Sequence, residues 1–136
     1  MTTPMQQRTF LDRVADRGQY RGDHEADRAA RVVLALLGAH LLGQVRAHLA
    51  ARLPEQYALI LLNPLNAAEP LNAERFVRAT AAWIEGATEA TALWDVGAVL
   101  SVVADTAGPE LTEEMLQQLP ADWPPLFGRP GHTAQP

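Results

Sequence analysis

Residues 23–41, DHEADRAARVVLALLGAHL, decide the fold of this chain because they contain its clearest amphipathic helix pattern. Apolar side chains recur there in steps of three and four residues, which places them on one side of an α-helix and predicts burial of that side in a helical bundle. Asp23 is the expected N-cap, and Gly43 is expected to interrupt the pattern that follows. The buried stripe consists of Ala26, Ala30, Val33, Leu37 and Leu41.

The rest of the first half has the same helical periodicity. Helices are predicted over residues 9–17, 44–52 and 54–62, because good helix formers dominate these stretches and no alternating β-branched run competes with them. Pro54 suits the first residue of the last helix, and the pair Asn63-Pro64 is expected to end it.

Helices are also predicted in the second half, each with an identifiable start. Asn72 and Thr88 are expected to cap two helices, and a further helix is expected over residues 112–119. The helix that starts at Asn72 carries an apolar stripe of Phe76, Thr80, Trp83, Ile84 and Ala87. The helix that starts at Thr88 is expected to turn four side chains inward, namely Leu93, Val96, Leu100 and Val103.

The two halves are similar when the chain is shifted by 66 residues without a gap. The shift places Phe10 on Phe76, and it places Tyr57 on Trp123. The apolar positions stay in register over about 50 residues, as expected for an internal repeat. We therefore predict an all-α bundle of seven to eight helices in two pseudo-symmetric repeats, which superpose about a near two-fold axis.

This pattern also predicts the organisation of the chain. A first repeat is expected over residues 1–62, a linker over 63–72, a second repeat over 73–127 and a flexible tail over 128–136. Each repeat alone is marginal for a stable core, so we expect the two to share one core as a single domain.

Three segments of the first half resemble a bacterial family of small proteins that is catalogued as a domain of unknown function, number 2267. They are FLDRVA at residues 10–15, ADRAARVVLALL at 26–37 and LAARLPE at 49–55. The resemblance extends more weakly over residues 73–127, where the second half keeps Leu119-Pro120 but lacks the arginine-rich face of residues 26–32. It implies an all-α fold and a bacterial cytoplasmic setting, and it implies no reaction.

Composition excludes several classes of function. The 136 residues include 11 basic and 16 acidic side chains, and the net charge of −5 is unlike that of a nucleic-acid-binding protein. Cysteine is absent, which excludes disulfides, thiol nucleophiles and thiolate metal sites. No stretch approaches the roughly 20 apolar residues of a membrane span, and residues 1–7 lack the apolar run of a signal peptide. We expect a cytoplasmic protein that binds neither nucleic acid nor membrane.

The residue types that bind metals or catalyse reactions in other proteins are poorly arranged for either role in this sequence. The cluster DHEAD at residues 23–27 is scattered around a helix and suits a helix start better than a metal site. His40 and His48 are separated by Gly43, with no carboxylate nearby. The single serine, Ser101, lies within an apolar helix, and no glycine-rich phosphate loop is present. We predict no catalytic residue, no cofactor and no metal.

Two sets of residues are candidates for contact with a protein partner. Trp123, Leu126 and Phe127 lie on a segment that Pro124 and Pro125 keep from being helical. They are expected either to pack back onto the bundle or to form an exposed docking segment. The second set is a charged face of arginines, whose interleaved acids favour ion pairs. It consists of Arg13, Arg17, Arg28 and Arg31.

Charge is unevenly distributed between the halves. Residues 1–66 carry eight arginines and six acids, whereas residues 67–136 carry three arginines and ten acids. This difference either assists docking of the two halves or allows the positive half of one molecule to meet the negative half of another. We expect a non-catalytic interaction or assembly module, with a homodimer as one possible state. The alternative is a small-molecule or lipid-binding protein, or an enzyme, with a pocket between the repeats.

Overall fold

The helical periodicity of the sequence produces helices throughout residues 6–64 and 70–128, which are the residues that the computed structural model describes. Within these ranges the chain forms seven α-helices, one short 3₁₀ helix and no strand, which confirms the predicted all-α fold. Their bounds are α1 Gln7–Gly18, α2 Asp23–Gly38, α3 Gly43–Ala50, α4 Glu55–Leu62, α5 Ala73–Trp83, α6 Glu89–Ala107, α7 Pro109–Gln118 and η1 Pro124–Phe127.

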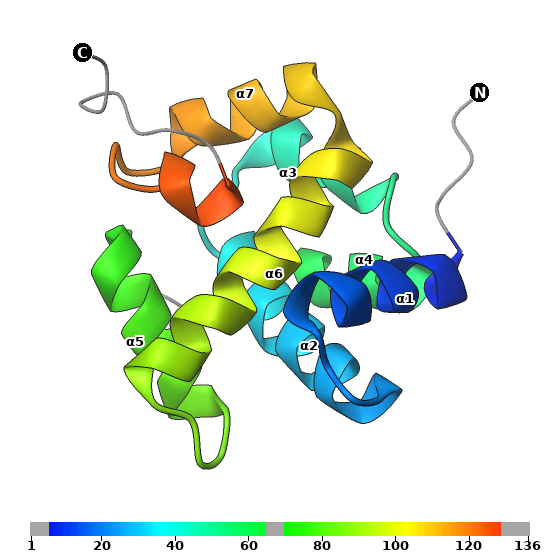
Figure 1. Ribbon diagram of the computed structural model, residues 1–136. Helices are drawn as coiled ribbons and strands as arrows, with labels where there is room; N and C mark the ends of the chain where they lie inside the picture. The colour runs from blue at the N-terminus through cyan, green and yellow to red at the C-terminus, as the bar shows by residue number, and fades with distance from the viewer. Residues whose placement is uncertain (1–5, 65–69, 129–136) are drawn as a thin grey trace.

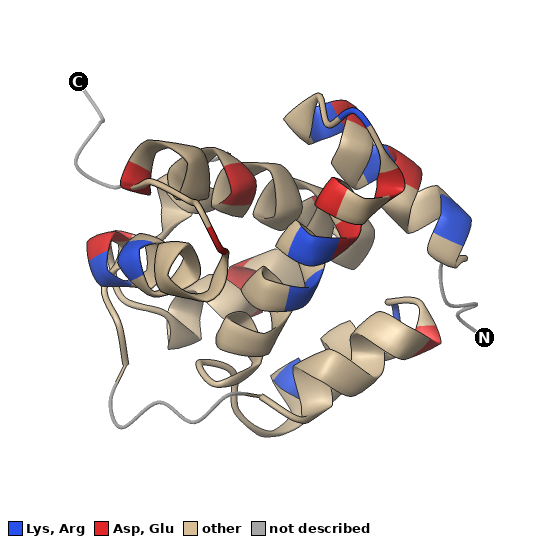
Figure 2. Cartoon of the chain, turned by 90° about the horizontal axis from the view of Figure 1, so that it is seen from below, with Lys and Arg blue, Asp and Glu red and all other residues tan. Residues whose placement is uncertain are grey.

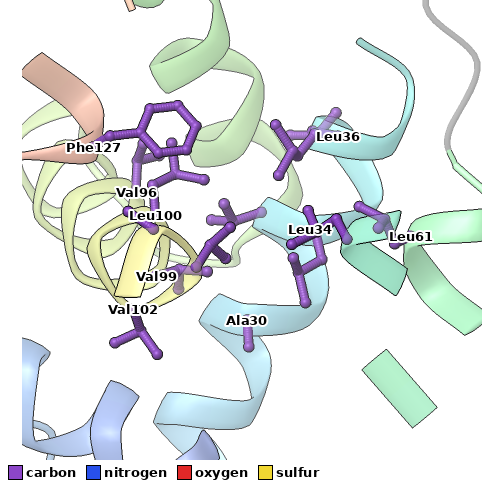
Figure 3. Packing of buried hydrophobic residues seen from close by; sticks show 14 of the residues in the cluster. Ala30, Leu34, Leu36, Leu61, Val96, Val99, Leu100, Val102 and Phe127 are labelled. Atoms are coloured by element: carbon purple, nitrogen blue, oxygen red, sulfur yellow. The ribbon is translucent and has the colours of Figure 1, made fainter. Parts of the chain in front are cut away.

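The longest helix, α6, lies at the centre of the bundle. It contacts α1, α2, α5, α7 and η1, and Figure 1 shows it crossing the front of the molecule between α5 and α1. Its valines and Leu100 point in several directions: Val102 lies toward α1, Val99 lies toward α2, and Val96 and Leu100 lie toward Phe127 of η1 (Figure 3). One continuous apolar cluster therefore contains side chains from both halves of the chain.

By length and composition alone, α6 also qualifies as a membrane-spanning helix. Its 18-residue window has a mean hydropathy of 1.3, so the expectation that no stretch approaches a membrane span was too strict. In the structure 44% of this window is buried inside the protein, and the core helix of a soluble protein passes the same test. The contacts of α6 with five other elements identify it as the central helix of this bundle.

The first residues of the helices show the same 66-residue spacing as the sequence. Helices α1, α2 and α3 begin at residues 7, 23 and 43, and α5, α6 and α7 begin 66 residues later, at 73, 89 and 109. The aromatic pairs follow the same spacing. The ring centroids of Phe10 and Tyr57 lie 5.0 Å apart, and those of Phe76 and Trp123 lie 4.4 Å apart. These are contacts that two related halves would share; superposition of the halves about a two-fold axis remains a prediction.

Two of the three predicted helix caps are confirmed. The Asn72 side chain accepts a hydrogen bond from the backbone N–H of Arg75, and Thr88 forms a reciprocal capping box with Thr91. The prediction for Asp23 was wrong, since Gly22 occupies the N-cap position and Asp23 is the first helical residue. Its carboxylate instead accepts two hydrogen bonds from the guanidinium of Arg8, at 2.7 and 2.6 Å.

Gly43 begins α3 instead of interrupting a helix. Its φ of +53° lies in the left-handed region that favours glycine, and this allows the chain to turn from Leu42 into the helix. Gly38 is required for a different reason, because α2 ends there against the backbone of α4. A β-carbon at Gly38 would lie 2.3 Å from the carbonyl oxygen of Leu61.

Leu71, just before α5, is held by two aromatic side chains. Its N–H donates to His40 Nε2 at 2.9 Å, and its carbonyl oxygen accepts from Trp123 Nε1 at 3.0 Å. Because Nε2 accepts, the proton of the neutral imidazole is on Nδ1, which lies 2.9 Å from the carbonyl oxygen of Leu36. His40 is therefore a buried structural residue that ties α2 to the segment before α5.

Substitution of His40 by leucine is expected to destabilise the protein by about 1–3 kcal/mol, because the partly buried N–H of Leu71 would lose its acceptor. The free energy of unfolding, measured by urea denaturation followed by circular dichroism, tests this expectation. His48→Leu on the exposed side of α3 is the control and should change stability by less than about 0.5 kcal/mol. Equal effects of the two substitutions would contradict the role assigned to His40.

Candidate interaction surface

The C-terminal segment is part of the core. Trp123 is fully buried, Leu126 and Phe127 are 6% and 3% exposed, and all three belong to the central apolar cluster. Pro124 and Pro125 shape the 3₁₀ turn η1, which packs against α6 where the first half has α4 packed against α2. Of the two alternatives, packing back onto the bundle therefore describes these side chains in the structure.

The four arginines of the predicted charged face have different surroundings. Arg17 pairs with Asp105 across the two halves, and Arg31 pairs with Asp27 within α2 at 2.7 Å. Arg13 is exposed on α1, and Arg28 lies in a cleft described below. Figure 2 shows basic and acidic residues interspersed on the helix next to the N-terminus. Two of the four arginines thus form ion pairs, each of which contributes at most about 1 kcal/mol at an exposed site.

Two residues of the predicted apolar stripes are exposed. Trp83, at the end of α5, is 59% exposed, and the other departure lies on α6. Leu93 was expected to point inward, but it is 52% exposed, and its neighbour Trp94 is 55% exposed. Together with Ala90 they form the exposed part of an uncharged stripe along one side of α6, which becomes less exposed toward Gly97, Ala98 and Ser101. We call this stripe the α6 outer face; it consists of Ala90, Leu93, Trp94, Gly97, Ala98 and Ser101.

The α6 outer face combines a ridge with two hollows. Leu93 and Trp94 form the ridge. A hollow of about 390 Å³ lies over Gly97 and Ala98 and is bordered by Arg17 of α1 and by η1. A second hollow, of about 370 Å³, lies between Leu93 and α5, where Glu74 and Val77 border it. Both hollows reach Leu126.

Trp94 is held in a defined orientation. Its indole Nε1 donates a hydrogen bond to the carbonyl oxygen of Gly18 at 2.9 Å, which fixes the ring against the end of α1. A fixed aromatic ring presents apolar area with little loss of conformational entropy on binding. The ridge of the α6 outer face is therefore preorganised.

A separate cleft of about 430 Å³ lies between the two halves. It is formed by the start of α2 and the loop before it, and by the start of α6 and the loop before it. Its charged residues are Glu25, Arg28, Glu85 and Asp95, and its aromatic residues are Tyr20 and Trp94.

The most buried acid of this cleft is Asp95. The Tyr20 hydroxyl donates a hydrogen bond to its carboxylate, and Asp95 has no ion-pair partner among the described residues. Burial raises the pKa of Asp95, while the Tyr20 hydrogen bond and the charge of Arg28 act in the opposite direction. Burial, together with the bond to Asp95, also raises the pKa of Tyr20, so the hydroxyl remains a donor at neutral pH.

Within the described residues, no three His, Asp or Glu side chains are grouped so that they could hold a metal ion.

Sequence comparison matches residues 7–126 to the family model for the uncharacterized conserved protein DUF2267. A search of curated proteins finds no match to the chain.

Proposed function

The chain belongs to the DUF2267 family of uncharacterized conserved proteins, and we propose that it is a non-catalytic assembly module that pairs with a second copy of itself. The pairing surface is the α6 outer face, and the setting is the bacterial cytoplasm. The observation that carries this proposal is the apolar composition of α6 on all its sides. A helix of that kind is normally covered all round, whereas Leu93 and Trp94 are more than half exposed here.

The shape of the α6 outer face favours a second copy as its occupant. In a two-fold dimer the same patch serves both molecules, so a surface must complement itself. The ridge of Leu93 and Trp94 lies beside the hollow over Gly97 and Ala98, and two copies related by a two-fold axis can each place a ridge in the other's hollow. The small residues of the hollow allow close approach of the two helices.

The charged residues at the borders of this surface are already paired within the chain. Arg17 at the α1 border pairs with Asp105, and Glu74 of α5 and Glu89 of α6 both pair with Arg78. Pairing of two copies therefore depends on the apolar ridge and hollow and not on these charges.

Substitution Leu93→Glu is expected to weaken self-association by at least about tenfold, because the dimer would bury a carboxylate without a partner. Sedimentation velocity over a range of protein concentrations measures the change in mass from twice 14.8 kDa to the single chain. Leu59→Glu is the matched control, because Leu59 on α4 is also exposed, at 54%, but lies outside the α6 outer face.

The salt dependence identifies the kind of interface. An apolar interface on α6 predicts a dimer that is insensitive to ionic strength, whereas pairing through the charged halves would weaken as salt rises. A chain that sediments as a monomer at every concentration would overturn the proposal. It would also be overturned if Leu59→Glu dissociates the dimer and Leu93→Glu does not.

A further inference from the structure

We propose that the cleft between α2 and α6 binds a small organic cation, with an ammonium group at Asp95 and an apolar body against Trp94. This inference does not rest on self-association: the cleft shares Ala90 and Trp94 with the α6 outer face, but Leu93 and Gly97 do not line it. Three properties of the cleft support it: the open volume beside Gly86, the excess of carboxylates and the aromatic side chain of Trp94.

Part of the open space in the cleft corresponds to a difference between the two halves. Tyr20 and Gly86 are 66 residues apart and precede α2 and α6, respectively. The Tyr20 ring packs on the end of α1, so closely that a β-carbon at Gly18 would lie 2.3 Å from it. At Gly86 there is no ring, and a β-carbon built there would meet no atom within 4 Å. The first half therefore fills its side of the cleft, and the second half leaves its side open.

The charge of the cleft favours a cation. Three carboxylates line it, from Glu25, Glu85 and Asp95, against the single guanidinium of Arg28. Asp95 is partly removed from water and its direct partner is a neutral phenol, Tyr20. A carboxylate that is partly removed from water loses solvation free energy, and one hydrogen bond from a neutral hydroxyl does not fully replace it. An approaching cation therefore stabilises the carboxylate.

The wall of the cleft suits an organic cation better than a metal ion. Trp94 is fixed by its bond to Gly18, and Ile84 adds a buried aliphatic side chain. An indole attracts an ammonium group through its π face and also packs against an alkyl chain. The volume of about 430 Å³ is in the range of small-molecule sites.

Three six-carbon probes test the proposal: n-hexylamine, hexan-1-ol and hexanoate, which share the alkyl chain and differ in charge. Binding is followed by the amide and indole resonances of ¹⁵N-labelled protein, with the indole N–H of Trp94 as the local reporter. The amine is expected to give saturable shifts at Trp94 and Asp95. The alcohol and the carboxylate are expected to bind at least about tenfold more weakly, since they lack the charge-assisted bond.

Variants identify the residues responsible. Asp95→Asn keeps the shape and an acceptor for Tyr20 but removes the charge, and it is expected to weaken amine binding about tenfold. Glu113→Gln on the exposed side of α7 is the control and should leave affinity unchanged. Arg28→Gln is expected to strengthen amine binding, because it removes the one positive charge of the cleft.

Three results would overturn the proposal: equal binding of the amine and the alcohol, preferential binding of hexanoate that Arg28→Gln abolishes, or unchanged amine affinity in Asp95→Asn. The Leu93→Glu variant should bind the amine at least as tightly as the parent chain, because Leu93 does not line the cleft and dissociation of the dimer would uncover Trp94. A failure of the dimer proposal and a failure of the cation site would therefore be seen separately.

Discussion

Replacement of Trp123 by alanine is expected to lower the free energy of unfolding by about 3–5 kcal/mol, which is a large part of the roughly 5–15 kcal/mol typical of a domain. Trp123 is fully buried and packs against Phe76 and His40, with ring centroids 4.4 and 5.2 Å away. The substitution leaves a cavity beside α6 and removes the donor to the carbonyl oxygen of Leu71. Urea denaturation monitored by circular dichroism at the helical minimum measures the loss.

Trp83→Ala is the matched control for this experiment. Trp83 ends α5 and is 59% exposed, so its loss removes the same side chain without opening a cavity. The expected change is below about 1 kcal/mol. If Trp123→Ala were no more destabilising than Trp83→Ala, the C-terminal segment would not be part of the core as described above.

Tyr57→Ala is expected to cost about 3–5 kcal/mol as well, although it lies in the other half of the chain. Tyr57 is fully buried, packs on Phe10, and donates a hydrogen bond from its hydroxyl to Asp27 at 2.5 Å. Because α1 and α2 both pack on α6, the halves share one core and should unfold together. Both variants should therefore shift a single transition, with circular dichroism and tryptophan fluorescence changing at the same urea concentration.

The conservative variant Tyr57→Phe separates the ring from the hydroxyl. It keeps the packing on Phe10 and is expected to cost only about 1 kcal/mol, since Asp27 keeps its ion pair with Arg31. Two resolved unfolding transitions, with Tyr57→Ala affecting one and Trp123→Ala the other, would show that the halves are independent domains.

Most of the helices could be predicted from periodicity, but the outward side of α6 could not. Helix α2 has a charged side and an opposite apolar side, so the sequence indicates which side is buried. Along α6 the stretch from Ala90 to Ala104 has Asp95 as its only charge, and periodicity cannot distinguish an inward leucine from an outward one. Leu93 was misplaced for this reason, and the same uniform apolar composition was the signal that could have indicated an exposed face.

Local helix rules failed where a distant residue supplied a stronger interaction. Asp23 has the side chain of an N-cap, but Arg8, fifteen residues earlier, binds its carboxylate with two hydrogen bonds. The cleft was equally beyond local rules, because it depends on how α2 and α6 pack and on the absence of a ring at Gly86. A pocket between the repeats could be expected from the sequence, but its residues could not.

The contact between α1 and α6 has a consequence for synthesis of the chain. Arg17 and Asp105 are 88 residues apart, and α1 packs on α6 along with α2. A ribosome therefore releases α1 and α2 long before α6, the helix that covers both, has been made. The nascent chain must expose part of its apolar surface until α6 has emerged, so its core cannot be completed before that point.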